Sequence, residues 1–295
     1  MRINPNPLSD LLSALSQTQQ QINSDLRQTA SGQSVNQPSD NPAAAAQLAR
    51  NADQTAEADQ FLRSVNSLSG EMQNADSALN SVITTLQRAI SLGVEGANGT
   101  LNASDRAALA AEVQGIQSEL LSLANLSYQG NFVFAGTATQ AAPYVLDSTS
   151  PSGVRYVGNS GVNQITVGNH LTVAANLPGS QLFSAAGADV FQSIQDLITG
   201  LQNGTGIDTA VDAVSSAYQH INAQRVFYGN VMNQLTSQQT FLNNETTQLA
   251  QQQNNLGGAD LSKVLSDLVN AQTSRQATLE AIGQTQQTNL FNYIK

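Results

Sequence analysis

The stretch ADQFLRSVNSLSGEMQNADSALNSVITTLQRA, residues 58–89, decides the fold because it carries an apolar residue at every third or fourth position. Steps of three and four place such residues on one face of an α-helix. We therefore predict a helix over residues 43–91, ended by Gly93, Gly96, Asn98 and Gly99. Its apolar stripe is Ala58, Phe61, Val65, Leu68, Met72, Ala75, Leu79, Val82, Leu86 and Ala89.

Further helical patterns follow this stretch. A third helix is predicted from an N-cap at Ser104, with a stripe at Leu109, Val113, Ile116, Leu120 and Leu123. A shorter helix is predicted over residues 190–201. After Gly204 and Gly206, apolar residues recur every seven positions at Ile221, Tyr228, Leu235, Leu242, Leu249 and Leu256. Such heptad spacing indicates a long helix packed along another one.

A shorter helical segment lies at each end of the chain. Ser31-Gly32 ends the first, and residues 33–42 read as an ordered turn in which Asn41 caps a helix that begins at Pro42. Gly257-Gly258 and an N-cap at Asp260 precede the last. These segments are too short to be stable alone, so we expect them to be largely disordered in the free chain and to fold on assembly.

Between the helical halves the apolar period changes to two. Short runs at 131–134, 143–146, 154–157, 164–167 and 171–173 are separated by Gly, Asn, Ser and Pro, which is typical of β-hairpins. The layout is nearly mirror-symmetric, and the simplest partner for each helix is its counterpart from the other end of the chain. We predict a mainly α, elongated antiparallel helical bundle with a small β-rich insert at the tip.

This layout predicts three parts. Residues 1–42 and 257–295 would form a terminal coiled-coil polymerisation domain, 43–135 and 187–256 a helical rod domain, and 136–186 a small β-rich outer domain. The assembly interface is predicted on apolar residues of the terminal helices. They are Leu8, Leu12, Leu15, Ile22, Leu26, Leu261, Leu265, Leu268, Leu279, Ile282, Leu290 and Phe291.

Composition excludes several classes of function. The net charge is −10 with a sequence pI near 4.4, which argues against binding to nucleic acid or to an anionic membrane surface. There is no Cys, so disulfide and thiolate chemistry are excluded. No apolar run is long enough for a membrane helix, and MRINPNP lacks the pattern of a cleaved signal peptide.

Nothing in the sequence indicates catalysis. The two histidines, His170 and His220, fall in different predicted elements, and no metal, nucleotide or nucleophile motif is present. Asp53, Glu57 and Asp59 lie together on one helix, where a solvated face is the simpler interpretation. We predict no enzymatic activity, no cofactor and no metal.

Both ends of the chain resemble the flagellin superfamily. Its N-terminal signature is similar to LRQTASGQSVN (26–36), its Asn-Gly-Thr turn to ANGT (97–100) with the helix that follows, and its C-terminal helix to residues 268–293. The segments QPSDNPAA (37–44) and GNFVFAG (130–136), with Pro143-Tyr144 and the start Met1-Arg2-Ile3, resemble the hook–filament junction family, hook-associated protein 3, more than flagellin itself.

This resemblance implies a structural subunit of the bacterial flagellum, exported by the flagellar type III apparatus and located outside the cell at the hook–filament junction. The partners that it implies are further copies of the chain in a ring, the other hook-associated junction protein, flagellin and an export chaperone. Two alternatives remain open: a flagellin that builds the filament, and a secreted adhesin or enzyme that acts through the β insert.

Overall fold

The computed structural model describes residues 7–291, with side chains described for residues 8–285. By its internal contacts the chain divides into two compact units. A terminal unit holds residues 1–57 and 244–295, and a central unit holds residues 58–243. The three-part division predicted from the sequence stays a prediction.

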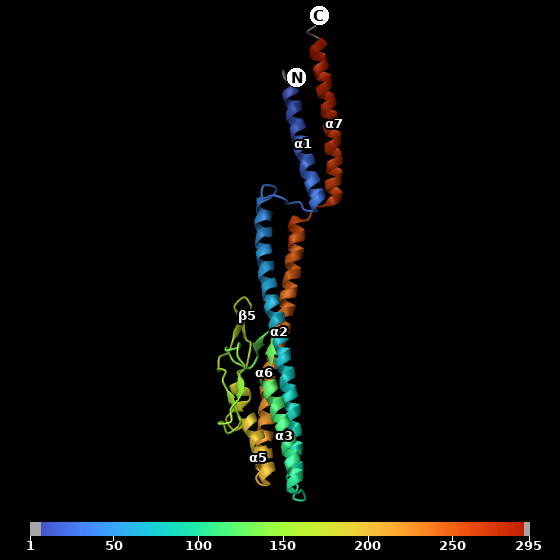
Figure 1. Cartoon of the computed structure of the whole chain (residues 1–295). Helices are drawn as coiled ribbons and strands as arrows, with labels where there is room; N and C mark the ends of the chain where they lie inside the picture. Colours follow the sequence, from blue (N-terminus) through green and yellow to red (C-terminus); the bar gives the residue numbers. More distant parts are fainter. Residues whose placement is uncertain (1–6, 292–295) are drawn as a thin grey trace. The chain divides into compact units, whose positions relative to one another are not determined.

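Seven helices lie within the described residues (Figure 1). The predicted helices are all present, and most of their bounds agree with the predicted ones. They are α1 (Pro7–Ser31), α2 (Pro42–Gly96), α3 (Ala103–Ala124), α4 (Gly179–Leu182), α5 (Val190–Asn203), α6 (Ile207–Gly257) and α7 (Leu261–Phe291).

Local sequence explains several helix ends. Gly32 takes a left-handed φ of +68° directly after α1, and its N–H donates to the Gln28 carbonyl over 2.8 Å. Asn41 Oδ1 accepts from the Ala44 N–H over 3.1 Å, so Asn41 caps α2 as predicted. Asp260 Oδ1 likewise accepts from the Lys263 N–H over 3.1 Å at the start of α7.

Two predictions about helix ends were wrong. Gly93 does not stop α2, which continues to Gly96, because both glycines serve helix packing: a Cβ at Gly93 would meet Val211 and one at Gly96 would meet Leu201. The N-cap of α3 is Asn102 and not Ser104. Asn102 Oδ1 accepts from the Asp105 N–H over 2.9 Å, and the Asp105 carboxylate accepts from the Asn102 N–H over 3.4 Å.

The described strands form four separate antiparallel hairpins rather than one sheet. All five predicted runs contain a strand, whereas β1, β7 and β8, with two residues each, were not predicted. The pairs are β1 (Ser127–Tyr128) with β2 (Asn131–Phe132), β3 (Tyr144–Leu146) with β4 (Val154–Tyr156), β5 (Gln164–Gly168) with β6 (Leu171–Ala174), and β7 (Ser184–Ala185) with β8 (Ala188–Asp189).

The hairpins lie beside the helices of the central unit and not at its tip, which corrects the predicted position of the β insert (Figure 1). Gln117 on α3 donates to the Ser152 carbonyl over 3.2 Å, and His220 on α6 contacts the Gln181 carbonyl over 2.7 Å. Packing of aromatic rings explains this position of the hairpins. Phe134 and Tyr144 pack in one cluster with Phe183 and with Phe191 of α5, with ring centroids 5.0–6.3 Å apart.

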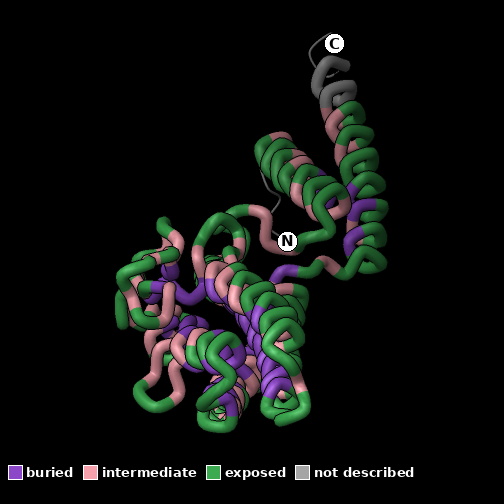
Figure 2. The backbone as a smooth tube through the Cα atoms, turned by 60° about the horizontal axis from the view of Figure 1, so that its bottom comes forward, coloured by how far each residue is buried: buried purple, intermediate pink, exposed green. Residues whose placement is uncertain are grey.

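Buried residues are concentrated in the central unit, where they line the facing sides of its helices (Figure 2). Nine of the ten residues of the deciding stripe belong to this core, and the tenth, Phe61, is partly buried and packs against it. The heptad residues of α6 face the same core from the other side, and Ile221, Tyr228 and Leu235 are at most 1% exposed. The predicted pairing of stripes from the two halves of the chain is therefore confirmed.

Candidate assembly surface

The terminal unit is built on the antiparallel pair of α1 and α7. Ile22 on α1 packs against Leu268 and Ala271 on α7, and these three residues form its small apolar cluster. Gln19 and Arg275 approach each other further along the pair, with Arg275 Nη1 3.4 Å from Gln19 Oε1. The predicted partnership of the two terminal helices is thus present in the structure.

A clamp between the two linkers joins this helix pair to the rest of the terminal unit. We use "linker clamp" for residues 32–34 and 257–259. The Ser34 N–H donates to the Gly257 carbonyl over 2.7 Å, and the Ala259 N–H donates to the Gly32 carbonyl over 3.0 Å. These two bonds flank an isolated antiparallel bridge between Gln33 and Gly258. Chain segments more than 220 residues apart are therefore fixed to each other by their backbones.

The ordered turn that precedes α2 is held by a single carboxylate. Asp40 Oδ2 accepts from the N–H groups of Asn36 and Gln37 over 3.0 and 2.9 Å. The Asn36 side chain in turn donates to the Gln33 carbonyl of the linker clamp over 2.8 Å. The segment 33–42 is consequently a defined turn, as predicted, although it contains no regular secondary structure.

The structure places the predicted interface residues in two groups. Ile22 and Leu268 are buried between α1 and α7, so they stabilise the pair itself. The others face outward or lie at the edge of the pair, and the side chains of Leu290 and Phe291 lie outside the described residues. Leu12, Leu26, Leu261, Leu265 and Leu279 are 46–51% exposed, whereas Leu8, Leu15 and Ile282 are half-buried.

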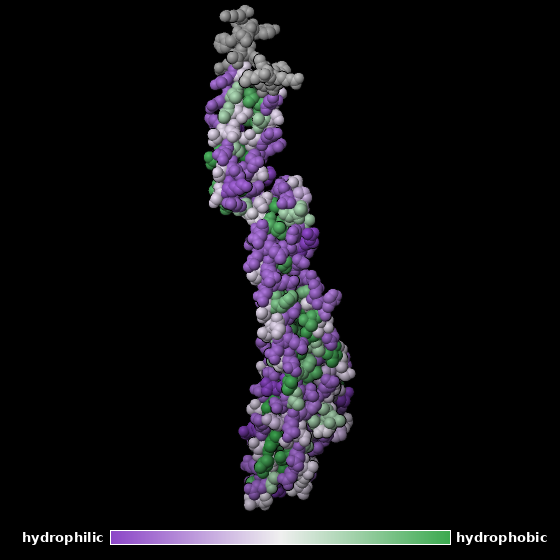
Figure 3. Space-filling model, turned by 180° about the vertical axis from the view of Figure 1, so that it is seen from behind, coloured by the Kyte–Doolittle hydropathy of each residue, from purple (hydrophilic) through white to green (hydrophobic). Residues whose placement is uncertain are grey.

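Sequence reasoning missed one member of the exposed group. Val269 is 60% exposed and follows Leu261 and Leu265 at a spacing of four residues, so all three lie on one side of α7. We call Leu261, Leu265 and Val269 the α7 stripe. The spacing could have identified Val269 from the sequence. Figure 3 shows hydrophobic residues between hydrophilic ones on the visible face of the terminal helices.

A hollow of about 480 Å³ lies between α1 and α7 beside these residues. Leu12, Leu15 and Leu279 line it together with Arg275, which is the one charged side chain among the described residues of its wall. A surface of exposed leucines with few charges can bind another apolar helix, because burying such side chains removes apolar area from water. The chemistry of this surface is therefore that of apolar packing.

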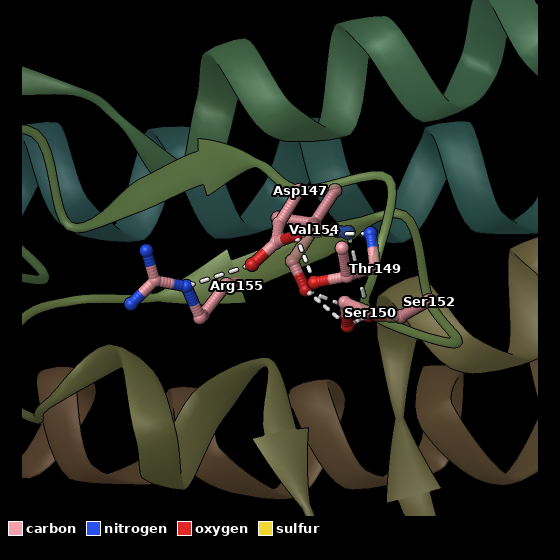
Figure 4. Close-up of polar contacts among 6 residues, drawn as sticks. All are labelled: Asp147, Thr149, Ser150, Ser152, Val154 and Arg155. Atoms are coloured by element: carbon pink, nitrogen blue, oxygen red, sulfur yellow. Dashed lines mark hydrogen bonds and ion pairs between the residues drawn. The ribbon is translucent and has the colours of Figure 1, made fainter.

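Polar side chains in the hairpin of β3 and β4 form hydrogen bonds within that hairpin. Asp147, the one acidic residue of the predicted insert, accepts from the Thr149 N–H and Oγ1 over 3.0 and 2.6 Å and from Arg155 Nε over 2.9 Å (Figure 4). The bonds from Thr149, ahead of the contact with Arg155, lower the pKa of the Asp147 carboxyl. Ser150 and Ser152 both donate to the Val154 carbonyl.

No constellation for metal binding occurs among the described residues: no three His, Cys, Asp or Glu side chains are grouped to hold an ion. His170 occupies the turn between β5 and β6 with a φ of +59°, and His220 lies on α6. Asp53, Glu57 and Asp59 are exposed, which confirms the solvated face that was predicted. In the described part of the chain no helix combines the length and apolarity needed to cross a bilayer.

Comparison with known proteins assigns the two helical halves to one family. The bacterial flagellin N-terminal helical region matches residues 4–139, and the bacterial flagellin C-terminal helical region matches residues 211–294. Together the two regions span about three quarters of the chain. The chain belongs to the bacterial flagellin family.

Individual relatives within this family differ in how much of the chain they match. The chain is 25% identical to flagellar hook-associated protein 3 of Escherichia coli K12 over 294 residues, which is 91% of each chain. It is also 25% identical to a flagellin of Listeria innocua, but over only 74% of this chain and 71% of that one.

Two solved structures share the fold. A putative flagellar hook-associated protein from Vibrio parahaemolyticus has a TM-score of 0.67 at 22% identity and covers 73% of this chain and 98% of its own. The flagellar junction protein FlgL from Legionella pneumophila has a TM-score of 0.61 at 16% identity and covers 72% of this chain and all of its own.

Proposed function

We infer that this chain is a hook-associated structural subunit of the bacterial flagellum, of the type that joins the hook to the filament. The observation that carries this inference is the extent of the similarity. The match to hook-associated protein 3 runs over nine tenths of both chains, whereas the match to flagellin leaves about a quarter of each chain unmatched. The protein acts by packing against other chains, and its site is the assembly surface of the terminal unit.

The terminal unit is suited to form the axial contacts of this assembly. The α7 stripe and Leu12, Leu26 and Leu279 expose apolar area that α1 and α7 do not cover for each other. We assign these residues to contacts with further copies of the chain in a ring, with the other hook-associated junction protein on one side and with flagellin on the other. Before export, a flagellar chaperone would cover the same stripe of α7.

Deletion of the gene tests the location at the junction. We expect hooks without filaments under the electron microscope, with flagellin shed into the medium. Loss of filaments with no flagellin in the medium would instead identify the chain as the flagellin. Normal filaments would exclude both, and the β hairpins would then be the segment to test for an adhesin or enzyme activity.

Complementation of the deletion strain tests the assembly surface. Val269→Ser removes an aliphatic side chain of the α7 stripe, and Val94→Ser is the matched control, because Val94 lies on α2 and is equally exposed at 60%. We expect Val269→Ser to reduce the fraction of hooks that carry filaments while Val94→Ser leaves it unchanged. Equal behaviour of the two variants would remove the α7 stripe from the interface.

A further inference from the structure

The tripeptide Asn-Gly-Thr occurs twice in the central unit, at residues 98–100 and 203–205. Asn98 lies two residues beyond the end of α2, Asn203 is the last residue of α5, and both are exposed. An asparagine that precedes a glycine can react with its own backbone, because the glycine has no Cβ to hinder a close approach. Since the two tripeptides are identical, a difference in their reactivity has to come from the fold.

At the first copy the reacting groups are available to each other. Asn98 Oδ1 accepts from the Thr100 N–H and from Thr100 Oγ1 over 3.1 and 2.9 Å, so the side chain folds back over Gly99. The same two donors stabilise the negative charge that develops on Oδ1 when a nucleophile attacks the side-chain carbonyl. The Gly99 N–H has no hydrogen-bond acceptor among the described residues, so no bond to this nitrogen has to break first.

At the second copy the glycine nitrogen is already engaged. The Gly204 N–H donates to the Gly200 carbonyl over 2.8 Å, and Gly204 takes the left-handed φ of +71° that ends α5. Arg106 packs against this glycine, since an added Cβ there would lie 2.8 Å from Arg106 Nη2. Reaction at Asn203 would therefore require a broken hydrogen bond and an unwound end of α5.

We propose that Asn98 is a site of spontaneous self-modification by deamidation, whereas the fold protects Asn203. The Gly99 nitrogen bonds to Asn98 Cγ, the bond from Cγ to the side-chain nitrogen breaks, and ammonia leaves with the proton of the Gly99 N–H. Water then opens the cyclic imide at either of its carbonyls, which yields aspartate or isoaspartate. The net change is hydrolysis of an amide, and no oxidant or reductant takes part.

The product alters the turn between α2 and α3. It adds a negative charge three residues after Glu95, in a chain whose net charge is already −10. The isoaspartate form also lengthens the backbone of a turn that the Leu101 N–H closes by donating to the Asn98 carbonyl over 3.1 Å. The fraction of acid at position 98 thus records the age of the chain, and this inference is independent of the proposed function.

Peptide mass spectrometry of the purified full-length chain, aged in a mildly alkaline buffer, tests the proposal. In the folded chain, acid at position 98 should accumulate at least about tenfold faster than acid at position 203, because a hydrogen bond and the end of a helix protect Asn203. In denaturant the two identical tripeptides should react at nearly equal rates. Circular dichroism checks that the aged chain is still folded.

Variants at the first copy test the two features that make it reactive. Gly99→Ala should remove most of the product at position 98, and it should leave the fold intact because a Cβ at Gly99 meets nothing within 4 Å. Thr100→Val removes the Oγ1 donor and should slow the reaction of the folded chain by about two- to tenfold, which is the effect of one hydrogen bond. Thr205→Val is the matched control at the second copy and should leave the rate at Asn203 unchanged.

Several results would overturn the proposal. Equal rates at the two sites of the folded chain, or a faster reaction at Asn203, would show that the fold does not select Asn98. A ratio that persists in denaturant would assign the difference to residues outside the tripeptides. Unchanged product in Gly99→Ala would mean that the acid does not form through the Gly99 nitrogen, and an unchanged rate in Thr100→Val would remove the role assigned to the contacts of Asn98 Oδ1.

Discussion

Arg225 on α6 donates two hydrogen bonds to the Asp76 carboxylate on α2, from Nε to Oδ1 over 2.8 Å and from Nη2 to Oδ2 over 2.9 Å. Residues of α2 with higher numbers pair with residues of α6 with lower numbers, so the two helices run antiparallel. The pair of Arg225 and Asp76 fixes one point of their register. Polar contacts keep nearly the same register elsewhere along the two helices. They join Gln87 to Tyr218, Asn66 to Gln239, and Asn51 to Gln252.

Breaking the pair of Arg225 and Asp76 should destabilise the central unit. Each side chain is about a quarter exposed, and a planar guanidinium matches both carboxylate oxygens, so a double-mutant cycle of Arg225→Ala and Asp76→Ala should give a coupling free energy of about 1 kcal/mol. The measurement is urea denaturation followed by circular dichroism.

The pair of Arg88 and Glu112 is the matched control for this cycle. These two side chains are 64% and 40% exposed, so solvent screens their attraction and their coupling should stay below about 0.5 kcal/mol. Equal couplings in the two cycles would contradict the role assigned to Arg225 as the residue that fixes the register.

The glycines of α2 should not tolerate a methyl group. An added Cβ at Gly96 would meet Leu201 Cδ2, and one at Gly93 would meet Val211 and come within 3.0 Å of Leu197 Cδ1. We expect Gly96→Ala to lower the free energy of unfolding by about 1–3 kcal/mol, because the fully buried side chain of Leu201 must be displaced. Thermal denaturation measures the change.

Gly115 provides the opposite case in α3. It is exposed and helical, and a Cβ there would have nothing within 4 Å. Gly115→Ala should therefore stabilise the protein by about 0.5–1 kcal/mol through higher helix propensity alone. Destabilisation by both substitutions would mean that the effect at Gly96 does not come from close packing.

The sequence was sufficient to predict the long helices, since apolar periodicity records which face of each helix is buried, but it did not predict the one-turn helix α4. Residues 58–89 pack as the spacing indicates, and the linkers fall where Gly and Pro occur. The pairing of helices from opposite ends of the chain could be predicted, but the individual residues that touch could not. Gly93 lies inside α2, where its lack of a side chain makes room for Val211. The hairpins lie beside the bundle because Tyr144 of β3 packs against Phe191 of α5. Likewise, spacing identified the leucines of the candidate interface but not that Leu268 is buried against Ile22.

The N-cap of α3 can be tested against the residue that sequence reasoning favoured. Asn102 forms a reciprocal pair of hydrogen bonds with Asp105, whereas Ser104 lies exposed inside the first turn. Asn102→Ala should cost about 1 kcal/mol of stability, and Ser104→Ala should change it by less than about 0.5 kcal/mol. Chemical denaturation of the two variants decides between the residues. A larger loss at Ser104 would restore it as the cap.

The effect of the Glu71 carboxyl group on stability should depend on pH; Glu71 lies on α2. Partial burial raises its pKa above the ordinary value of 4.5, so the folded chain disfavours the charged form. The resulting loss of stability is absent below pH 4.5 and becomes complete once the pH exceeds the raised pKa. Glu71→Gln should therefore stabilise the protein at pH 7, by under about 1 kcal/mol given the exposure of the group, and the gain should vanish as the pH falls towards 4.

Urea midpoints at pH 4, 5, 6 and 7 measure this difference. Glu119→Gln on the exposed side of α3 controls for the loss of one negative charge from an acidic chain, and it should give a smaller gain with a weaker dependence on pH. A gain for Glu71→Gln that stays constant between pH 4 and pH 7 would show that the variant acts through packing rather than through the ionisation of Glu71. A gain that grows with pH only at Glu71 locates the effect at that partly buried carboxylate.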